Sequence, residues 1–414
     1  MSIPKPQPLY PSQSEFEYLT PDDYAHLQAL FKDSEGWVKQ HWLWGKDFLK
    51  FISRNKSEHT FTRFRGETER FLIWAFFVKQ KPVDTLRKTD ILQYADFLWK
   101  PPESWICTNN YDKFQLSNGH FIVNEKWRPF RLSSPKHQEK HDTDIDKRKY
   151  RPSQQTLTAS FTGIIAFYNY LIGEELAYAN PAQLAKKDCR YFIKDAQVKE
   201  VRRLNESQWQ YVLDVVTALA DSDDKYERSL FVIAALKTLF LRISELSERR
   251  TWSPLSSHFW EDDDGNWWLK IYGKGRKLRD TTVPPKFIPY LKRYRQYRGL
   301  PPLPSPSENF PLVEKIRGSG GMTSRHLSRL VQEIFDFAYE KMNQKEGEDK
   351  ARKLREASTH WLRHTGASME IERGRALKDL SEDLGHASMA TTDTVYVQTE
   401  NKRRAESGKN RKVD

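Results

Sequence analysis

The residues best suited to chemistry lie near the C-terminal end of the sequence, in the stretch 358–399. This stretch contains His360, Arg363, His386 and Tyr396, in that order. An arginine is always charged and offers a planar pair of donors that matches phosphate oxygens. A phenol has a pKa of about 10, so a tyrosine becomes a nucleophile at neutral pH only beside a base or in a positive field. Together, these residue types could bind a phosphate and activate a tyrosine beside it.

A second group of candidate residues lies upstream. Arg242 and Glu245 stand in the segment LRISEL, and Lys274 and Lys277 stand in the turn YGKGRK. Cleavage of a phosphodiester without a metal needs positive charge at the non-bridging oxygens, which Arg242 and Arg363 could supply. A lysine on a hairpin could protonate the leaving oxygen, and Glu245 could orient Arg242 or a histidine. Taken singly, such an Arg–Glu pair is more often structural and a turn lysine is more often solvated, so the prediction rests on the whole set.

The two histidines have different expected roles. His360 is the expected proton acceptor for the tyrosine, and His386 is expected to donate a further hydrogen bond in the transition state. His360 and His364 also have the i,i+4 spacing of a helical metal pair, but Trp361 stands where the HExxH motif has its glutamate. We therefore expect neither a metal nor another cofactor.

In this order the motifs resemble the signature of the tyrosine recombinases, the family of phage integrases, Xer proteins and Cre-type enzymes. The resemblance implies a site-specific DNA recombinase or integrase. Such an enzyme forms a 3′-phosphotyrosine link without metal or ATP and works as a tetramer on two DNA sites. By its position in the GKGxK pattern, Lys274 corresponds to the lysine of the family signature, and Lys277 is the alternative. Tyr396 follows His386 by ten residues, one more than the commonest spacing in the family.

Two other functions remain open at this point. A type IB topoisomerase or a resolvase-like enzyme would share the chemistry, and strand exchange between two defined sites would distinguish it. A non-cleaving DNA-binding accessory protein would keep the fold and have no need of the complete set of catalytic residues. Double-stranded DNA is the expected partner in each case. Sister recombinases and accessory DNA-bending proteins are further candidate partners of a recombinase.

The composition agrees with a polyanionic partner. The chain has 414 residues and a formal net charge of +12, a balance that suits nucleic acid. Its two cysteines, Cys107 and Cys189, form neither a CxxC pair nor a disulfide framework. The sequence contains no run of 18 apolar residues and begins without the apolar core of a secretory signal. We expect a cytoplasmic, nucleoid-associated protein that makes no contact with a membrane.

The periodicity of apolar residues predicts a mainly α fold with a small antiparallel β-sheet. We expect helices that begin at the caps Thr60, Asn205 and Thr323, and three strands within 257–284. With the resemblance, this gives a helical core-binding domain followed by a mixed α/β catalytic domain. The expected parts are a disordered lead (1–21), a helical, SAM-like DNA-binding domain (22–190) with an insertion (101–152) that holds a hairpin near Asn118-Gly119, a linker (191–204), the catalytic domain (205–400) and a basic tail (401–414).

Overall fold

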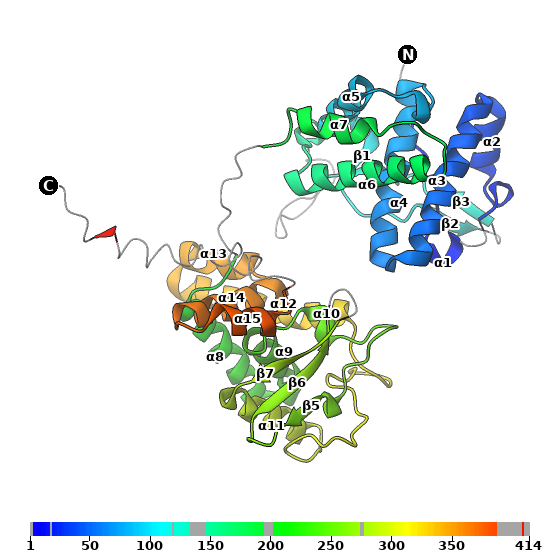
Figure 1. The fold of residues 1–414 in the computed structure, drawn as a ribbon. Helices are drawn as coiled ribbons and strands as arrows, with labels where there is room; N and C mark the ends of the chain where they lie inside the picture. The colour runs from blue at the N-terminus through cyan, green and yellow to red at the C-terminus, as the bar shows by residue number, and fades with distance from the viewer. Residues whose placement is uncertain are drawn as a thin grey trace. The chain divides into compact units, whose positions relative to one another are not determined.

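The chain folds as two compact units, residues 1–196 and 197–414, which are shown in Figure 1. The computed structural model describes residues 3–16, 19–117, 120–132, 146–193, 202–273, 277–386 and 408–409. The boundary between the units falls inside the predicted linker 191–204, most of which lies outside the described residues. Within the described ranges, no helix combines the length and the apolar character needed to cross a membrane.

The N-terminal unit is helical, as the sequence predicts. Its helices are α1 (Gln13–Phe16), α2 (Ala25–Asp33), α3 (Gly36–Asn55), α4 (Glu58–Trp74), α5 (Lys88–Trp99), α6 (Gln154–Gly173) and α7 (Pro181–Asp188). The predicted apolar stripes of α4 and α6 are buried, with Phe71 and Phe161 both fully inside the core. The cap of α4 differs from the prediction. The side chain of Ser57 accepts a hydrogen bond from the Thr60 amide, and the helix begins at Glu58.

The first residues of the chain correct the prediction of a disordered lead at 1–21. Leu9, Tyr10, Phe16 and Leu19 are buried in the core of the N-terminal unit. The Tyr10 ring stacks on Trp42 at 5.8 Å between centroids, and its hydroxyl donates to the Trp42 carbonyl at 2.8 Å. The proline- and serine-rich composition suggested disorder, but these aromatic contacts with α3 hold the segment in place.

The insertion 101–152 belongs to the core of the same unit. It forms two small sheets, with β1 (Ile106–Cys107) parallel to β4 (Phe130–Arg131) and β2 (Phe114–Ser117) antiparallel to β3 (His120–Val123). The β2–β3 pair confirms the predicted hairpin, although its turn at 118–119 lies outside the described residues. Trp105 and Phe130 are buried with the helices, so the insertion extends the domain.

The C-terminal unit combines helices with one sheet. Its elements are α8 (Glu206–Ser222), α9 (Glu227–Thr238), α10 (Ile243–Leu246), β5 (Phe259–Glu261), β6 (Trp267–Tyr272), β7 (Leu278–Val283), α11 (Ile288–Tyr297), α12 (Ser324–Glu346), α13 (Glu348–Glu356), α14 (Thr359–Glu372) and α15 (Leu377–Leu384). The strands pair antiparallel in the order β5-β6-β7, which confirms the predicted sheet. Asn205 and Thr323 cap α8 and α12, as predicted.

Helix α14 approaches α9 closely at Gly366. A Cβ atom at this position would lie 2.0 Å from the Lys237 carbonyl oxygen, so only glycine allows the two helices to pack this tightly. Just after α9 the chain turns sharply at Phe240, whose φ is 51°. The left-handed region costs an L-residue about 1–2 kcal/mol. The turn brings the residues after α9 against α14 and α15, where Phe240 packs with Leu380 and Leu384.

Replacing Gly366 with alanine should therefore destabilise the C-terminal unit by about 1–3 kcal/mol or more, because α9 and α14 must separate to admit the methyl group. Urea unfolding followed by tryptophan fluorescence would measure the change. The control is Gly66→Ala in the middle of α4, where an added Cβ meets nothing within 4 Å. That change should stabilise the protein by about 0.5–1 kcal/mol, as alanine usually does inside a helix. Equal effects of the two substitutions would contradict the close approach at Gly366.

Candidate active site

A buried carboxylate, that of Glu245, lies at the centre of the candidate site. Its side chain is 1% exposed, and three arginines surround it. Arg279 donates from Nη1 to Oε1 at 2.8 Å and from Nη2 to Oε2 at 3.0 Å. Arg242 donates to Oε1 at 3.0 Å, and Nη1 of Arg363 lies 3.8 Å from Oε2. One negative charge therefore holds three positive charges together.

The end of helix α15 provides a second set of acceptors for the same arginines. Arg363 donates from Nη2 to the Leu384 carbonyl at 2.6 Å, and Arg242 lies 3.5 Å from that oxygen. Arg279 donates from Nε to the Asp383 carbonyl at 3.1 Å. The last carbonyls of a helix have no partner within it and carry a partial negative charge. The arginines satisfy these carbonyls, which fixes α15 against Glu245.

Arg242 is held by its own position in the chain. It is the N-cap residue of the short helix α10, and its amide donates to Oε2 of Glu245 at 2.8 Å. Glu245 follows Arg242 by three residues, so its side chain can fold back onto the start of α10. The Arg242 side chain is 27% exposed, so it is the most accessible of the three arginines.

Arg363 lies on α14 and is almost completely buried, at 2% exposed. Besides the Leu384 carbonyl, it donates from Nη1 to the carbonyl of Phe240. Its Nη2 also lies 3.4 Å from Nε2 of His386. The structure therefore brings together four of the predicted residues, Arg242, Glu245, Arg363 and His386, through direct contacts.

Sequence analysis missed Arg279, whose guanidinium donates to both carboxylate oxygens of Glu245. Arg279 pairs with Ile271 across the sheet and stands two residues before Thr281, and both of these neighbours are buried. Alternate residues of a strand share one face, so an arginine in register with Thr281 and Val283 points toward the core. An arginine on the inward face of a predicted strand is therefore the sequence signal that could have identified Arg279.

Two glycines allow backbone to approach Arg279. A Cβ at Gly385 would lie 2.8 Å from Cδ of Arg279, and its φ of 60° also favours glycine. A Cβ at Gly273, directly after the strand β6, would lie 2.9 Å from Nη1 of Arg279. His386 follows the first glycine and Lys274 follows the second. Both catalytic candidates thus come directly after residues that touch the Arg279–Glu245 pair.

Four predicted residues are not joined to this cluster by a described hydrogen bond or ion pair. His360, on α14, packs against His364. Lys274 and Tyr396 lie outside the described residues. Lys277 is exposed just before β7, and its carbonyl accepts a hydrogen bond from the Gly273 amide at 2.8 Å. This main-chain bond joins Gly273 and Lys277, the described residues on either side of 274–276.

The three histidines near the cluster are neutral at physiological pH. Burial, followed by the charges of Arg363, Arg242 and Arg279, lowers the pKa of His386 to about 4. His364 is lowered further, to a pKa of about 3, by burial and then by His360, Arg363 and His386. The pKa of His360 is also lowered. The causes are partial burial and then the charges of Arg363 and Arg242, and part of the residue remains exposed to solvent.

Glu245 remains ionised in the same environment. Burial by itself would raise the pKa of Glu245, but the hydrogen bonds and charge of Arg279, the charge of Arg363 and the Arg242 amide outweigh burial and lower it. The site thus combines a permanent carboxylate, three permanent cations and neutral imidazoles. Its net charge is positive, which suits an anionic group such as a phosphate.

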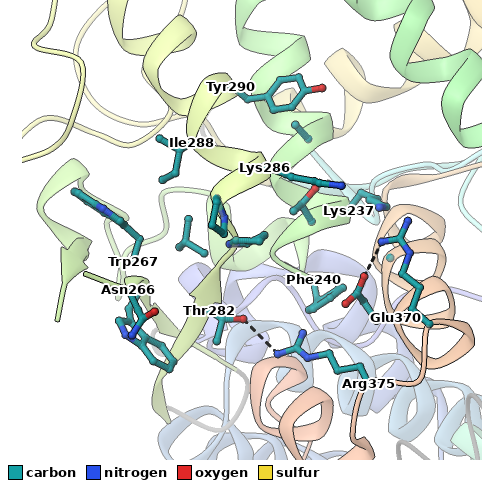
Figure 2. A pocket seen from close by; sticks show the side chains of 18 of the residues that line it. Lys237, Phe240, Asn266, Trp267, Thr282, Lys286, Ile288, Tyr290, Glu370 and Arg375 are labelled. Atoms are coloured by element: carbon teal, nitrogen blue, oxygen red, sulfur yellow. Dashed lines mark hydrogen bonds and ion pairs between the residues drawn. The ribbon is translucent and has the colours of Figure 1, made fainter. Parts of the chain in front are cut away.

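One pocket of the C-terminal unit is separate from this cluster. It has a volume of about 730 Å³, and Figure 2 shows the side chains around it, including Phe240, Thr282 and Arg375. None of the described candidate residues lines it. Two residues of its wall hold α15 in place. Thr282 donates from its amide and hydroxyl to Asp383 of α15 at 3.0 and 2.6 Å, and Arg375 donates to the same carboxylate.

The described residues contain no group of three or more His, Cys, Asp or Glu side chains arranged to hold a metal ion. His360 and His364 lie close together, with ring centroids 4.3 Å apart. A third ligand beside them is not among the described side chains.

Comparisons with known proteins agree with this architecture. Residues 202–403 match the model of the phage integrase family. The tyrosine recombinase XerC of Leptospira interrogans is 25% identical over 251 residues, which cover 60% of this chain and 70% of that protein. XerC of Thermodesulfovibrio yellowstonii is 26% identical over 255 residues, covering 60% and 72%. The solved structure of the XerH site-specific recombinase bound to a palindromic difH substrate has the same fold, with a TM-score of 0.55, 16% identity and coverage of 96% and 92%.

Arg279→Met should destabilise the C-terminal unit by about 3 kcal/mol near neutral pH, because it leaves a buried carboxylate with fewer partners. Urea unfolding would measure the effect. A folded-state pKa below the ordinary value means that ionised Glu245 contributes stability above about pH 4.3 and that this stability disappears as the pH falls. The difference between wild type and variant should therefore shrink under acid conditions. The control is Arg250→Met, at an exposed position of the same unit; an equal effect there would refute the special role of Arg279.

Proposed function

Since the chain belongs to the phage integrase family and is a tyrosine-type site-specific recombinase, we propose that it cuts and rejoins duplex DNA through Tyr396. The observation that carries this proposal is the group of three arginines held around Glu245 and the end of α15. Family membership supplies the reaction type, and the arginine cluster supplies a positive site for the phosphate. The solved relative XerH is bound to its difH substrate, which supports double-stranded DNA as the partner.

The arginines neutralise the charge that develops on the phosphate. Arg242 is the first contact, because its side chain is the most exposed of the three arginines, at 27%. Arg363 is 2% exposed and raises the positive potential from its buried position, where it donates to the Leu384 carbonyl at 2.6 Å. Arg279 acts through Glu245 and is a positioning residue. Such fixed charges stabilise a transition state without having to reorganise during the reaction.

The neutral histidines can exchange protons and hydrogen bonds. His360 accepts the proton of the Tyr396 hydroxyl, since its lowered pKa keeps a free lone pair at neutral pH. His386 donates a hydrogen bond to a non-bridging oxygen from beside Arg363. Glu245 stays ionised and keeps Arg242 oriented.

The bond changes balance without an external energy source. The Tyr396 oxygen bonds to phosphorus and the bond from phosphorus to the 5′ oxygen breaks, giving a 3′-phosphotyrosine link and a free 5′ hydroxyl. Lys274 gives its proton to the leaving oxygen. Religation to a new strand reverses these steps, so one phosphodiester is formed for each one broken and no ATP is needed.

The recombinase is proposed to act as a tetramer on two DNA sites, with the basic tail 401–414 passing to a neighbouring subunit. Sister recombinases or accessory DNA-bending proteins are candidate additional partners. A protein with this substrate belongs with the nucleoid in the cytoplasm. A topoisomerase or resolvase would share the cleavage step, and joining of two distinct duplexes separates recombination from relaxation.

Wild-type protein incubated with a nicked suicide duplex should form a covalent DNA adduct that survives a denaturing gel, and Tyr396→Phe should form none. Arg242→Ala should reduce adduct formation by about 10²–10³-fold while largely retaining DNA binding, as expected for a group that stabilises transition-state charge. The duplex must carry the end sequence of the element that encodes the protein. An adduct that persists in Tyr396→Phe would assign the nucleophile to another residue, and failure of Arg242→Ala to bind DNA would assign that arginine a structural role.

The leaving-group acid can be identified with a substrate whose bridging 5′ oxygen is replaced by sulfur. A thiolate leaves without protonation, so this substrate should restore cleavage to a variant that lacks only the acid. Lys274→Ala should be slow on the oxygen substrate and close to wild type on the sulfur substrate. Lys277→Ala is the matched comparison in the same turn. If the sulfur substrate rescued Lys277→Ala and not Lys274→Ala, Lys277 would be the acid. If it rescued neither variant, both lysines would be excluded as the acid.

A further inference from the structure

The insertion 101–152 and helix α4 line an open cavity of about 350 Å³ in the N-terminal unit. Helix α4 contributes Glu69 and Arg70, and the insertion contributes Lys113, Arg128 and Arg131. The cavity therefore has four cationic side chains and one carboxylate. It lies outside the C-terminal unit that contains the arginine cluster.

The carboxylates near the cavity already have partners. Glu69 lies 2.5 Å from the ammonium of Lys113, and it also accepts the amides of Leu9 and Tyr10 at 2.7 and 3.2 Å. Glu67, on the same helix, accepts from Nη1 of Arg70 at 2.6 Å. Among the described residues, these four cations and two glutamates give a net positive charge.

Two of the cations are fixed by neutral acceptors. Arg128 donates to the carbonyls of Ser104 at 2.7 Å, Glu125 at 2.9 Å and Trp127 at 2.5 Å. Arg70 also donates from Nε and Nη2 to the Pro129 carbonyl at 3.3 and 3.2 Å. A carbonyl orients a guanidinium without cancelling its charge. The positions of these groups are therefore set before any anion binds.

Two of the four cations, Lys113 and Arg70, are mostly buried. The side chains of Lys113 and Arg70 are 14% and 15% exposed, and the Lys113 ammonium lies 5.6 Å from the centroid of the Trp127 ring. Burial, opposed by Glu69 and reinforced by Arg65 and Arg70, lowers the pKa of Lys113 to about 8. Burial is the main cause, so the ammonium lies where water is partly excluded.

We propose that this cavity binds a phosphate of the DNA backbone, so that the insertion gives the N-terminal unit an additional DNA contact independent of base sequence. The proposal rests on the proposed function for its choice of duplex DNA as the anion. Guanidinium and ammonium groups in fixed positions are the usual partners of backbone phosphates, and such contacts set position without reading sequence. Arg131, exposed at the end of β4, and the half-exposed Arg128 are the groups that a phosphate would meet first.

The test is the salt dependence of DNA binding by the full chain. Fluorescence anisotropy with a labelled duplex would be measured over a series of NaCl concentrations, in a Tyr396→Phe background that cannot be cleaved. Arg128→Gln with Arg131→Gln should reduce the slope of log K against log [NaCl] by about one for each phosphate that is no longer neutralised. Affinity should fall by the same factor on the recombination site and on a random duplex. The matched control is Lys32→Gln with Lys39→Gln, two exposed lysines of α2 and α3 that do not line the cavity.

A slope that falls no further in the cavity pair than in the control pair overturns the proposal. Arg131→Gln alone guards against misfolding, because it leaves the carbonyl contacts of Arg128 intact and should still lower the slope. If millimolar inorganic phosphate raises the melting temperature while the cavity variants leave the DNA slope unchanged, the cavity holds free phosphate and the proposal is wrong. A wild type that forms no adduct would refute the catalytic role of Tyr396, and the slope comparison would stand by itself.

Discussion

The candidate active site depends on the burial of one carboxylate among three arginines. Two unit charges about 4 Å apart interact by about 4 kcal/mol near a protein surface, so guanidinium groups gathered without an anion would repel one another. Glu245 offsets that repulsion and leaves the group with a net positive charge. The final carbonyls of α15 add neutral acceptors on the other side. A site assembled in this way can attract a phosphate and still hold its cations in place.

The fold serves this cluster by bringing separate segments of the chain to one point. The turn at Phe240 and the N-terminus of α10 bring Arg242, the sheet brings Arg279, α14 brings Arg363, and α15 with Gly385 brings His386. Several of these approaches depend on a residue without bulk or with an unusual backbone conformation. Gly366 permits contact between α9 and α14, and Gly273 and Gly385 make room for the Arg279 side chain. These glycines of the C-terminal unit are thus as important to the site as its charged residues.

The N-terminal unit uses charge in a different way. Its buried Glu69 binds Lys113 and also two amides of the first segment, so one carboxylate connects the insertion, α4 and the start of the chain. Aromatic packing completes the connection: Tyr24, between the first segment and α2, stacks on Phe121 of β3 at 5.5 Å between centroids. The insertion is therefore a structural part of this unit as well as the wall of a positive cavity. In the C-terminal unit the cations gather around one carboxylate, whereas here backbone carbonyls hold two of them.

The sequence by itself determined whatever depends on near neighbours. The caps at Asn205 and Thr323, the three strands, the hairpin in the insertion and the pairing of Arg242 with Glu245 all involve residues within a short stretch of chain. The order of motifs also predicted the similarity to the phage integrase family, whose model matches residues 202–403. Tertiary structure alone decided which distant residues meet. Arg279 reaches Glu245 across 34 positions, and Tyr10 finds Trp42 across 32, which orders a segment whose composition suggested disorder. Contacts of this kind depend on how helices and strands pack, and no local pattern of residue types specifies that packing.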